Sequence, residues 1–333
     1  MDRNCLPATS LTCRTAAFGL NWESALPLWQ FHEVPCAGEP DIRVTVATSA
    51  PARKVVSSRG EIEFCDDGLR LCVEQHCILD IVNENSIVVT PLSDWDGVLP
   101  PHFFGTITAL VAARRGLLPV HATTVEYEGA AFLLCGRSGA GKSTIGAHLL
   151  ALGARFVSDD LTIIRMEGGT GPCALSGRSG FKLHPDTVAE LDGFLEARSV
   201  TVNKGKVLAL PTVAVFGRSV PLAGVVLLGE DTASVPKPFL PLVMQAQLFR
   251  PRLIHALGMG KRCAAMLNQV ATGVPIVRMR GIGGYGPAER RERAMQIMDW
   301  IRGSSGLGCR RLARRKIGYL KLPLCQAGMT FVA

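Results

Sequence analysis

A glycine-rich stretch between residues 136 and 144 constrains this chain more than any other feature. It fits the pattern G-x-x-x-x-G-K-[ST], in which the glycines let backbone N–H groups converge on phosphate oxygens. The residues are Gly136, Arg137, Ser138, Gly139, Ala140, Gly141, Lys142, Ser143 and Thr144. An apolar run over 130–135 precedes the stretch, and apolar residues at helical spacing follow over 145–152. The sequence therefore predicts a strand, a phosphate-binding P-loop and a helix.

Two side chains of this loop have expected roles. Lys142 should reach the β- and γ-phosphates of a nucleotide, and the hydroxyl of Ser143 should hold Mg²⁺. The helix that follows directs its positive end at the same phosphates. A glycine-rich turn that matches the pattern by chance is the alternative, but the flanking strand and helix favour nucleotide binding.

Two adjacent carboxylates, Asp159 and Asp160, end a predicted strand over 155–158, only 17 and 18 residues after Lys142. A helix and a short return over that distance would bring the pair back beside the phosphates, at the edge where open α/β sheets bind ligands. One carboxylate can coordinate Mg²⁺ while the other accepts a proton from an attacking hydroxyl. The alternative is an Asp pair that only caps the next turn.

His121 begins a predicted pair of strands, over 120–127 and 130–135, that are joined at Glu128-Gly129 and lead into the loop. A lone histidine is more often a hydrogen-bonded structural residue than a catalytic one. The position of His121 in the sequence, taken alone, therefore favours a structural role.

The first third of the chain differs from the rest in its pattern. Residues 1–101 contain short alternating runs, over 42–46, 61–64 and 69–73, which predict a β-rich N-terminal domain. Helical spacing over 103–115 then opens a second domain, expected over 102–302. In it we expect helices over 186–197 and 286–302, and buried strands over 222–228 and 274–279. Strands mixed with helices around one P-loop imply an α/β core.

The net charge of +8 is concentrated at one end, since residues 303–333 contribute six basic residues and no acidic ones. A solvated or disordered tail is favoured over a dedicated contact for an acidic partner, and nucleic acid is not favoured as a ligand. The chain lacks an apolar run of about 18 residues and the layout of a secretory signal. We therefore expect no membrane partner and a cytoplasmic location.

Taken together, these motifs resemble the catalytic domain of the HPr kinase/phosphorylase family. The residues that carry the resemblance are His121-Ala122, the loop over 136–143, Gly153 after the helix, and Ser158-Asp159-Asp160. The family has a P-loop fold unrelated to eukaryotic protein kinases, and it transfers the γ-phosphoryl group of ATP to a serine hydroxyl of a protein. The resemblance implies an α/β fold with a P-loop kinase core of the HPr-kinase type, preceded by a smaller β-rich N-terminal domain.

The resemblance also implies roles for individual residues. Lys142 and the loop hold ATP, Ser143 and Asp159 bind Mg²⁺, Asp160 acts as the base, and His121 becomes a catalytic residue near the phosphates. The implied reaction is ATP- and Mg²⁺-dependent phosphorylation of a serine in a peptide or small protein. The family's relatives assemble as oligomers, which leaves a homo-oligomer open.

The resemblance is specific over residues 119–164 and weaker beyond them. The family's downstream Leu-Glu-Ile-Arg-Gly type motif, which supplies a glutamate for Mg²⁺, has no counterpart between Asp160 and Lys206. This departure points to a divergent branch of the family. The short, β-rich front end resembles that of HPr-kinase-like proteins found with machinery for ribosomally made peptides, including lasso peptides, so a lasso precursor peptide is one candidate acceptor. A non-catalytic ATP-binding sensor or accessory module and a small-molecule kinase stay open as alternatives.

Basic residues in the second half of the chain are candidates for a clamp on the phosphates or on the substrate, because phosphoryl transfer needs its charge neutralised. They are Arg178, Lys182, Lys204, Lys206 and Arg250, of which we favour Arg250 and Lys182.

Overall fold

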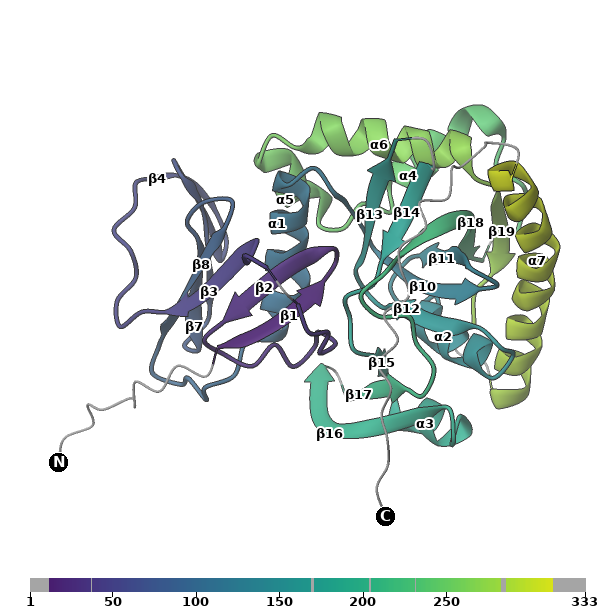
Figure 1. Ribbon diagram of the computed structural model, residues 1–333, viewed down its shortest axis with the longest axis horizontal. Coiled ribbons are helices and arrows are strands. Elements are labelled where there is room, and N and C mark those ends of the chain that lie inside the picture. Colours follow the sequence, from purple (N-terminus) through teal and green to yellow (C-terminus); the bar gives the residue numbers. More distant parts are fainter. Residues whose placement is uncertain are drawn as a thin grey trace, which may run out of the picture.

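The computed structural model describes residues 12–36, 38–168, 171–203, 205–230, 232–282 and 286–313. Figure 1 shows a β-rich part at the N-terminal end, a central mixed sheet covered by helices, and a small sheet beside helix α3. This arrangement confirms the predicted mixed α/β class with a β-rich front end. Within the described residues, no helix is both long enough and apolar enough to span a bilayer.

The N-terminal sheet has eight strands in the order β1-β2-β3-β8-β7-β6-β5-β4. They are β1 (Cys13–Ala17), β2 (Leu20–Ser24), β3 (Ile42–Val46), β4 (Val55–Arg59), β5 (Ile62–Cys65), β6 (Gly68–Val73), β7 (Cys77–Ile81) and β8 (Ser86–Pro91). The three strands predicted in this region are present as β3, β5 and β6, and β5 and β6 form the expected hairpin. Strand alternation places one row of side chains in the core, which is why the pattern was visible in the sequence.

A buried ion cluster stabilises the middle of this sheet. The carboxylate of Asp80 in β7 is fully buried, and it accepts hydrogen bonds from Arg53 Nη1 at 3.1 Å and Arg70 Nε at 2.9 Å. Arg53 is itself only 2% exposed, and it also pairs with the half-exposed Asp67. Asp80 is therefore a fully buried counter-charge that both guanidinium groups share.

Replacement of Asp80 by Ala should lower the free energy of unfolding by about 3–5 kcal/mol, because Arg53 and Arg70 lose their fully buried counter-charge and keep only the more exposed Asp67 and Glu63. Chemical denaturation of the variant would measure this loss. Asp67→Ala is the matched control, since Asp67 also pairs with Arg53 but is 47% exposed; it should cost less than about 1 kcal/mol. Equal losses in the two variants would contradict the burial argument.

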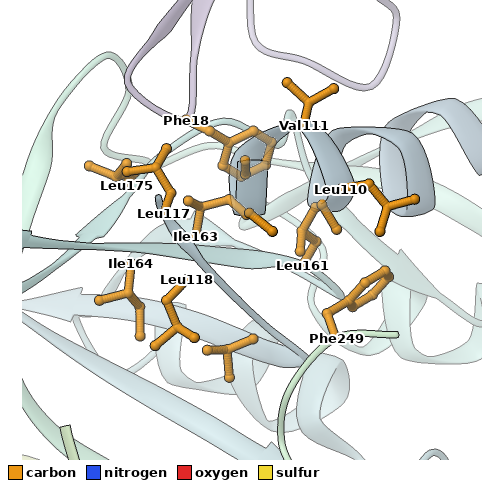
Figure 2. Packing of buried hydrophobic residues seen from close by; sticks show 14 of the residues in the cluster. Phe18, Leu110, Val111, Leu117, Leu118, Leu161, Ile163, Ile164, Leu175 and Phe249 are labelled. Atoms are coloured by element: carbon orange, nitrogen blue, oxygen red, sulfur yellow. The ribbon is translucent and has the colours of Figure 1, made fainter. Parts of the chain in front are cut away.

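The predicted helix over 103–115 is confirmed as a π-helical turn, η1 (Phe103–Ile107), followed by α1 (Thr108–Arg114). Its side chains from Phe103 to Ala113 are buried all round, which is typical of a helix enclosed by other elements. Figure 2 shows Leu110 and Val111 of this helix beside Phe18 of the N-terminal part and Ile163 of the central part. One continuous hydrophobic core therefore joins the two parts of the molecule.

The central sheet has the strand order β12-β10-β11-β18-β14-β13-β9, with β19 also paired to β18. Its strands are β9 (Leu118–Val120), β10 (Ala122–Tyr127), β11 (Ala130–Gly136), β12 (Arg155–Ser158), β13 (Thr162–Glu167), β14 (Gly171–Leu175), β18 (Ser219–Gly229) and β19 (Ile276–Arg280). The strand before the loop, β11, runs parallel to β18, as its continuous apolar run predicts.

Helices cover both faces of this sheet. On one face, α2 (Lys142–Leu150) and α7 (Pro287–Ala313) pack on β10, β11 and β18 through a separate apolar cluster. The remaining helices of the central part are η2 (Lys237–Phe239), α4 (Leu240–Gln245), α5 (Pro251–Ala256) and α6 (Gly260–Gly273). Figure 1 shows α4 and α6 on the side of the sheet where β13 and β14 lie, with α7 at the opposite side.

Strand direction determines what meets at one edge of the sheet. Strand β10 is antiparallel to both β11 and β12, so β11 and β12 run in the same direction and end at the same edge. The start of β10 lies at that edge too, because Ala122 pairs with Cys135. His121, the loop after β11, and Asp159 after β12 are therefore brought together by the topology.

A third sheet, in the order β15-β17-β16, covers the approach to this edge. It consists of β15 (Phe181–Leu183), β16 (Leu195–Asn203) and β17 (Lys206–Pro211), and α3 (Pro185–Glu190) connects β15 to β16. The predicted helix over 186–197 is thus wrong in its second half, because residues from Leu195 pair with β17 instead. The apolar spacing in this segment is compatible with a helix or a strand, and pairing with β17 decided in favour of a strand.

The last described helix, α7, begins near the predicted start at 286 but continues to Ala313. The expected boundary at residue 303 therefore falls inside a helix and does not coincide with the end of an element. Most of the basic tail, residues 314–333, lies outside the described residues.

Candidate functional site

The predicted strand, loop and helix are present as β11, residues 137–141 and α2. Three glycines of the loop, Gly136, Gly139 and Gly141, have φ of 147°, 87° and 86°. Side chains rarely adopt these values, so the turn depends on glycine. A Cβ on Gly136 would lie 2.4 Å from the backbone oxygen of Leu228, and one on Gly141 would lie 2.1 Å from Cγ1 of Ile282.

Gly141→Ala should lower the free energy of unfolding by about 2–4 kcal/mol, through left-handed strain and overpacking against Ile282. Gly139→Ala is the matched control, because Gly139 has nearly the same φ but no atom within 4 Å of the added Cβ. Strain alone should cost the control about 1–2 kcal/mol. Denaturation curves would show the difference, and a control as unstable as Gly141→Ala would contradict the role of packing.

The side chain of Lys142 folds back over its own loop. Its Nζ donates to the carbonyl oxygens of Gly136 at 2.8 Å and Arg137 at 3.2 Å. Burial lowers the pKa of this ammonium, although the nearby Asp159 carboxylate acts in the opposite direction. A cation thus lies against the glycine-rich loop, an arrangement suited to phosphate oxygens.

Ser143 and Asp159 meet directly. The hydroxyl of Ser143 donates to Asp159 Oδ1 at 2.8 Å, and Thr123 Oγ1 donates to the same oxygen at 2.6 Å. The other oxygen of Asp159 accepts the backbone N–H of Lys182 at 3.0 Å. Asp159 is only 1% exposed, so these three donors fix its carboxylate beside the loop. The predicted return of the Asp pair to the phosphate edge is what the structure has.

Asp160 is held differently from its neighbour. Its backbone has φ of 67°, an uncommon conformation for a side-chain-bearing residue. Its Oδ2 lies 2.8 Å from Lys182 Nζ and 3.6 Å from Arg178 Nη2. Burial raises the pKa of the Asp160 carboxyl, but the charges of Lys182 and Arg178 outweigh it, and the pKa lies well below its usual range. The carboxylate is therefore ionised at neutral pH.

The side chain of Arg178, which contacts Asp160 Oδ2, is only 2% exposed. Its Nη1 donates to Gln30 Oε1 at 2.6 Å, so the N-terminal part of the chain contacts the ion pairs of Asp160.

His121 lies near the other carboxylate oxygen of Asp160. Its Nδ1 is 2.9 Å from the backbone oxygen of Asp160 and 3.5 Å from Oδ1 of the same residue. Because a carbonyl oxygen can only accept, Nδ1 carries the proton in this contact. Burial and the charge of Lys142 lower the pKa of the His121 imidazole, so the ring is neutral at pH 7. Its other nitrogen, Nε2, is then an acceptor.

A cavity of about 430 Å³ brings these groups together, and four of the predicted catalytic side chains line it: His121, Lys142, Asp159 and Asp160. Lys182 and Lys206, both candidates for the basic clamp, also line the cavity. Arg250 does not; it begins α5 with its guanidinium 5.8 Å from the ring of Phe249. Lys204 lies outside the described residues.

The cavity has further lining residues that the sequence patterns did not indicate. They are His184, Asp186, Thr187, Ile282 and Arg290. They come from two helices and from residues just before them, and nothing in their local sequence indicates that they face one cavity.

Two oxygen donors at the loop have the chemistry that Mg²⁺ requires. Ser143 and Asp159 present a hydroxyl and a carboxylate oxygen 2.8 Å apart at the loop. Mg²⁺ prefers oxygen ligands, and in phosphate sites it is usually held by one or two protein oxygens together with phosphate oxygens and water. The residues therefore fit the ion. Among the described residues, no group of three or more His, Cys, Asp and Glu side chains could hold a metal without such help.

Comparison with known proteins shows a distant similarity to a solved structure. No protein-family model matches the sequence, and no curated protein matches it. Among solved structures, the chain is similar to the Hpr(Ser) kinase/phosphatase from Coxiella burnetii, with 13% sequence identity over 36% of this chain and 71% of that chain. The TM-score is 0.24, so the overlap is partial, and the function has to be argued from the residues of the site.

Proposed function

We propose that this protein is an ATP- and Mg²⁺-dependent serine kinase of the HPr-kinase type, acting on a peptide or small protein. The observation that supports this most is the pair of adjacent acids at the loop. Asp159 accepts a hydrogen bond from Ser143 at 2.8 Å, while Asp160 carries its own set of ion pairs and stays available to an acceptor. A hydrolase needs only one acid in this position.

Each residue has a defined task in this proposal. The backbone N–H groups of 138–143 and the ammonium of Lys142 hold the phosphates of ATP. Ser143 and Asp159 would hold Mg²⁺, which when bound neutralises charge on the β- and γ-phosphates. Asp160 accepts a hydrogen bond from the serine hydroxyl and takes its proton as the phosphoryl group moves.

The low pKa of Asp160 is compatible with this task. A carboxylate that is already ionised is ready to accept a proton, and the loose transition state of phosphoryl transfer requires little basicity before the bond to phosphorus forms. Lys182, 2.8 Å from Asp160, adds positive charge on the side where the transferring group arrives. His121 supports Asp160 through its backbone oxygen.

The test is incubation of the whole chain with Mg²⁺ and ATP labelled in its γ-phosphate, together with serine-containing peptides and small proteins, small-molecule alcohols, or no acceptor. We expect label on a serine of a peptide or protein, including lasso precursor peptides among those offered. A peptide with that serine replaced by alanine is the control and should stay unlabelled.

The same experiment separates the alternatives. Label on a small alcohol alone would indicate a small-molecule kinase, for which the same loop and acids would serve. ATP binding without label on any acceptor would indicate an ATP-binding sensor or accessory module. Either outcome would overturn the serine kinase proposal.

A further inference from the structure

The cavity continues past the groups that face the phosphates. Asp160 and Lys182 lie 2.8 Å apart at one end, and Asp186, Thr187 and Arg290 belong to another part of its wall. The backbone leads from Lys182 in β15 to Asp186 in the first turn of α3. Four residues of extended chain span at most about 13 Å, and the cavity is lined at both ends of this segment.

Helix α2 indicates where the part of the wall formed by Asp186, Thr187 and Arg290 lies. Its first residues, Lys142 and Ser143, face the acids, whereas His148 lies five residues later, about 7.5 Å along the helix axis. The Nε2 atom of His148 is 3.4 Å from Glu190 Oε2, and Glu190 Oε1 in turn is 2.8 Å from Arg290 Nη1. Arg290 therefore lies beside the second turn of α2, away from Asp159 and Asp160.

Arg290 is held in place by several acceptors. Its Nη1 lies 2.8 Å from Glu190, 3.3 Å from Asp186 and 3.4 Å from Thr187, and its side chain is only 19% exposed. Asp186 is 59% exposed, so part of its carboxylate still faces open space. The arginine thus fixes an accessible carboxylate in the wall of the cavity.

An apolar side chain, Ile282, lines the same cavity as this carboxylate. Ile282 is 4% exposed, its N–H donates to the backbone oxygen of Ala140, and its side chain packs against Gly141. A carboxylate would repel a further phosphate, but it accepts hydrogen bonds from neutral hydroxyl groups. A cavity lined by both an accessible carboxylate and an apolar side chain therefore suits a sugar with an attached flat base.

We propose that Asp186, Arg290 and Ile282 form the nucleoside end of the cavity. Asp186 accepts a hydrogen bond from a ribose hydroxyl, Arg290 holds Asp186 in position, and Ile282 packs against the base. This inference rests on the proposed function, and it identifies the residues that select a nucleoside triphosphate over an inorganic phosphate chain.

The test compares binding of ATP with binding of inorganic tripolyphosphate, each with Mg²⁺, by calorimetry on the whole chain. Asp186→Ala should weaken ATP binding about tenfold, which corresponds to one hydrogen bond to a charged group, and should leave tripolyphosphate binding within about twofold. Retained tripolyphosphate binding also shows that the variant is folded. Asp192→Ala is the matched control, because Asp192 is an exposed acid nearby that does not line the cavity.

ATP analogues lacking the 2′- or the 3′-hydroxyl provide a second arm. One of them should bind the unchanged protein about tenfold more weakly than ATP does, and Asp186→Ala should bind that analogue and ATP equally. Equal weakening of ATP and tripolyphosphate by Asp186→Ala, no weakening of either, or full affinity for both analogues would overturn this inference alone. Failure of the unchanged protein to bind both ATP and tripolyphosphate would overturn the proposed function as well.

Discussion

Asp160→Asn should lower the rate of phosphoryl transfer by about 10²–10⁴-fold, the usual contribution of a positioned base. Asn keeps the shape of the side chain but cannot take the proton of the serine hydroxyl. ATP affinity should change little, because the loop, Lys142 and Ser143 are left intact. Single-turnover transfer to the labelled peptide and calorimetric ATP binding would measure the two effects separately.

The same substitution has a second expected effect. Arg178 is 2% exposed and would lose the carboxylate 3.6 Å from its Nη2, so the free energy of unfolding should fall by a few kcal/mol. Assays are therefore best made well below the melting temperature, with ATP binding as evidence of folding. Asp192→Asn is the control on an exposed acid. Unchanged transfer in Asp160→Asn would refute the assignment of the base.

Lys142→Ala should lower the rate of transfer by about 10²–10³-fold and should also weaken ATP binding, because it removes the cation nearest the phosphates. The loop itself should persist, since its turn depends on the φ angles of Gly136, Gly139 and Gly141. Burial lowers the pKa of this ammonium, so its removal relieves a desolvation cost and should not destabilise the fold.

Equilibrium binding of ATP and the transfer assay would measure these losses, with denaturation curves for stability. Lys237→Ala is the matched control, because Lys237 is an exposed lysine that does not line the cavity. If Lys142→Ala retained the affinity and the rate of the unchanged protein, the phosphates would not bind at this loop.

Local patterns predicted the elements that carry the site. The apolar run before the loop became β11, the alternating runs became β3, β5 and β6, and the Asp pair followed β12. The prediction was wrong in the second half of 186–197, where α3 ends at Glu190 and Leu195 begins the strand β16. A short apolar pattern is compatible with a helix or a strand, and pairing with β17 decided between them.

The clamp residues show where sequence reasoning reached its limit. Lys182 and Arg250 were favoured equally, yet Lys182 contacts both acids and Arg250 lies outside the cavity. The presence of a basic residue in the sequence does not indicate the direction in which its side chain points. That direction follows from the strand to which it belongs, and β15 is placed by its pairing with β17.

The sequence by itself determined the phosphate-binding loop, because its glycines, its lysine and its flanking strand and helix are contiguous and act through local backbone geometry. It also indicated the Asp pair, since 17 residues suffice for only one helix and a return strand. Only the tertiary structure decided that His121, Lys182 and Arg290 line one cavity. These residues come from distant elements, and strand direction and core packing alone bring their side chains together.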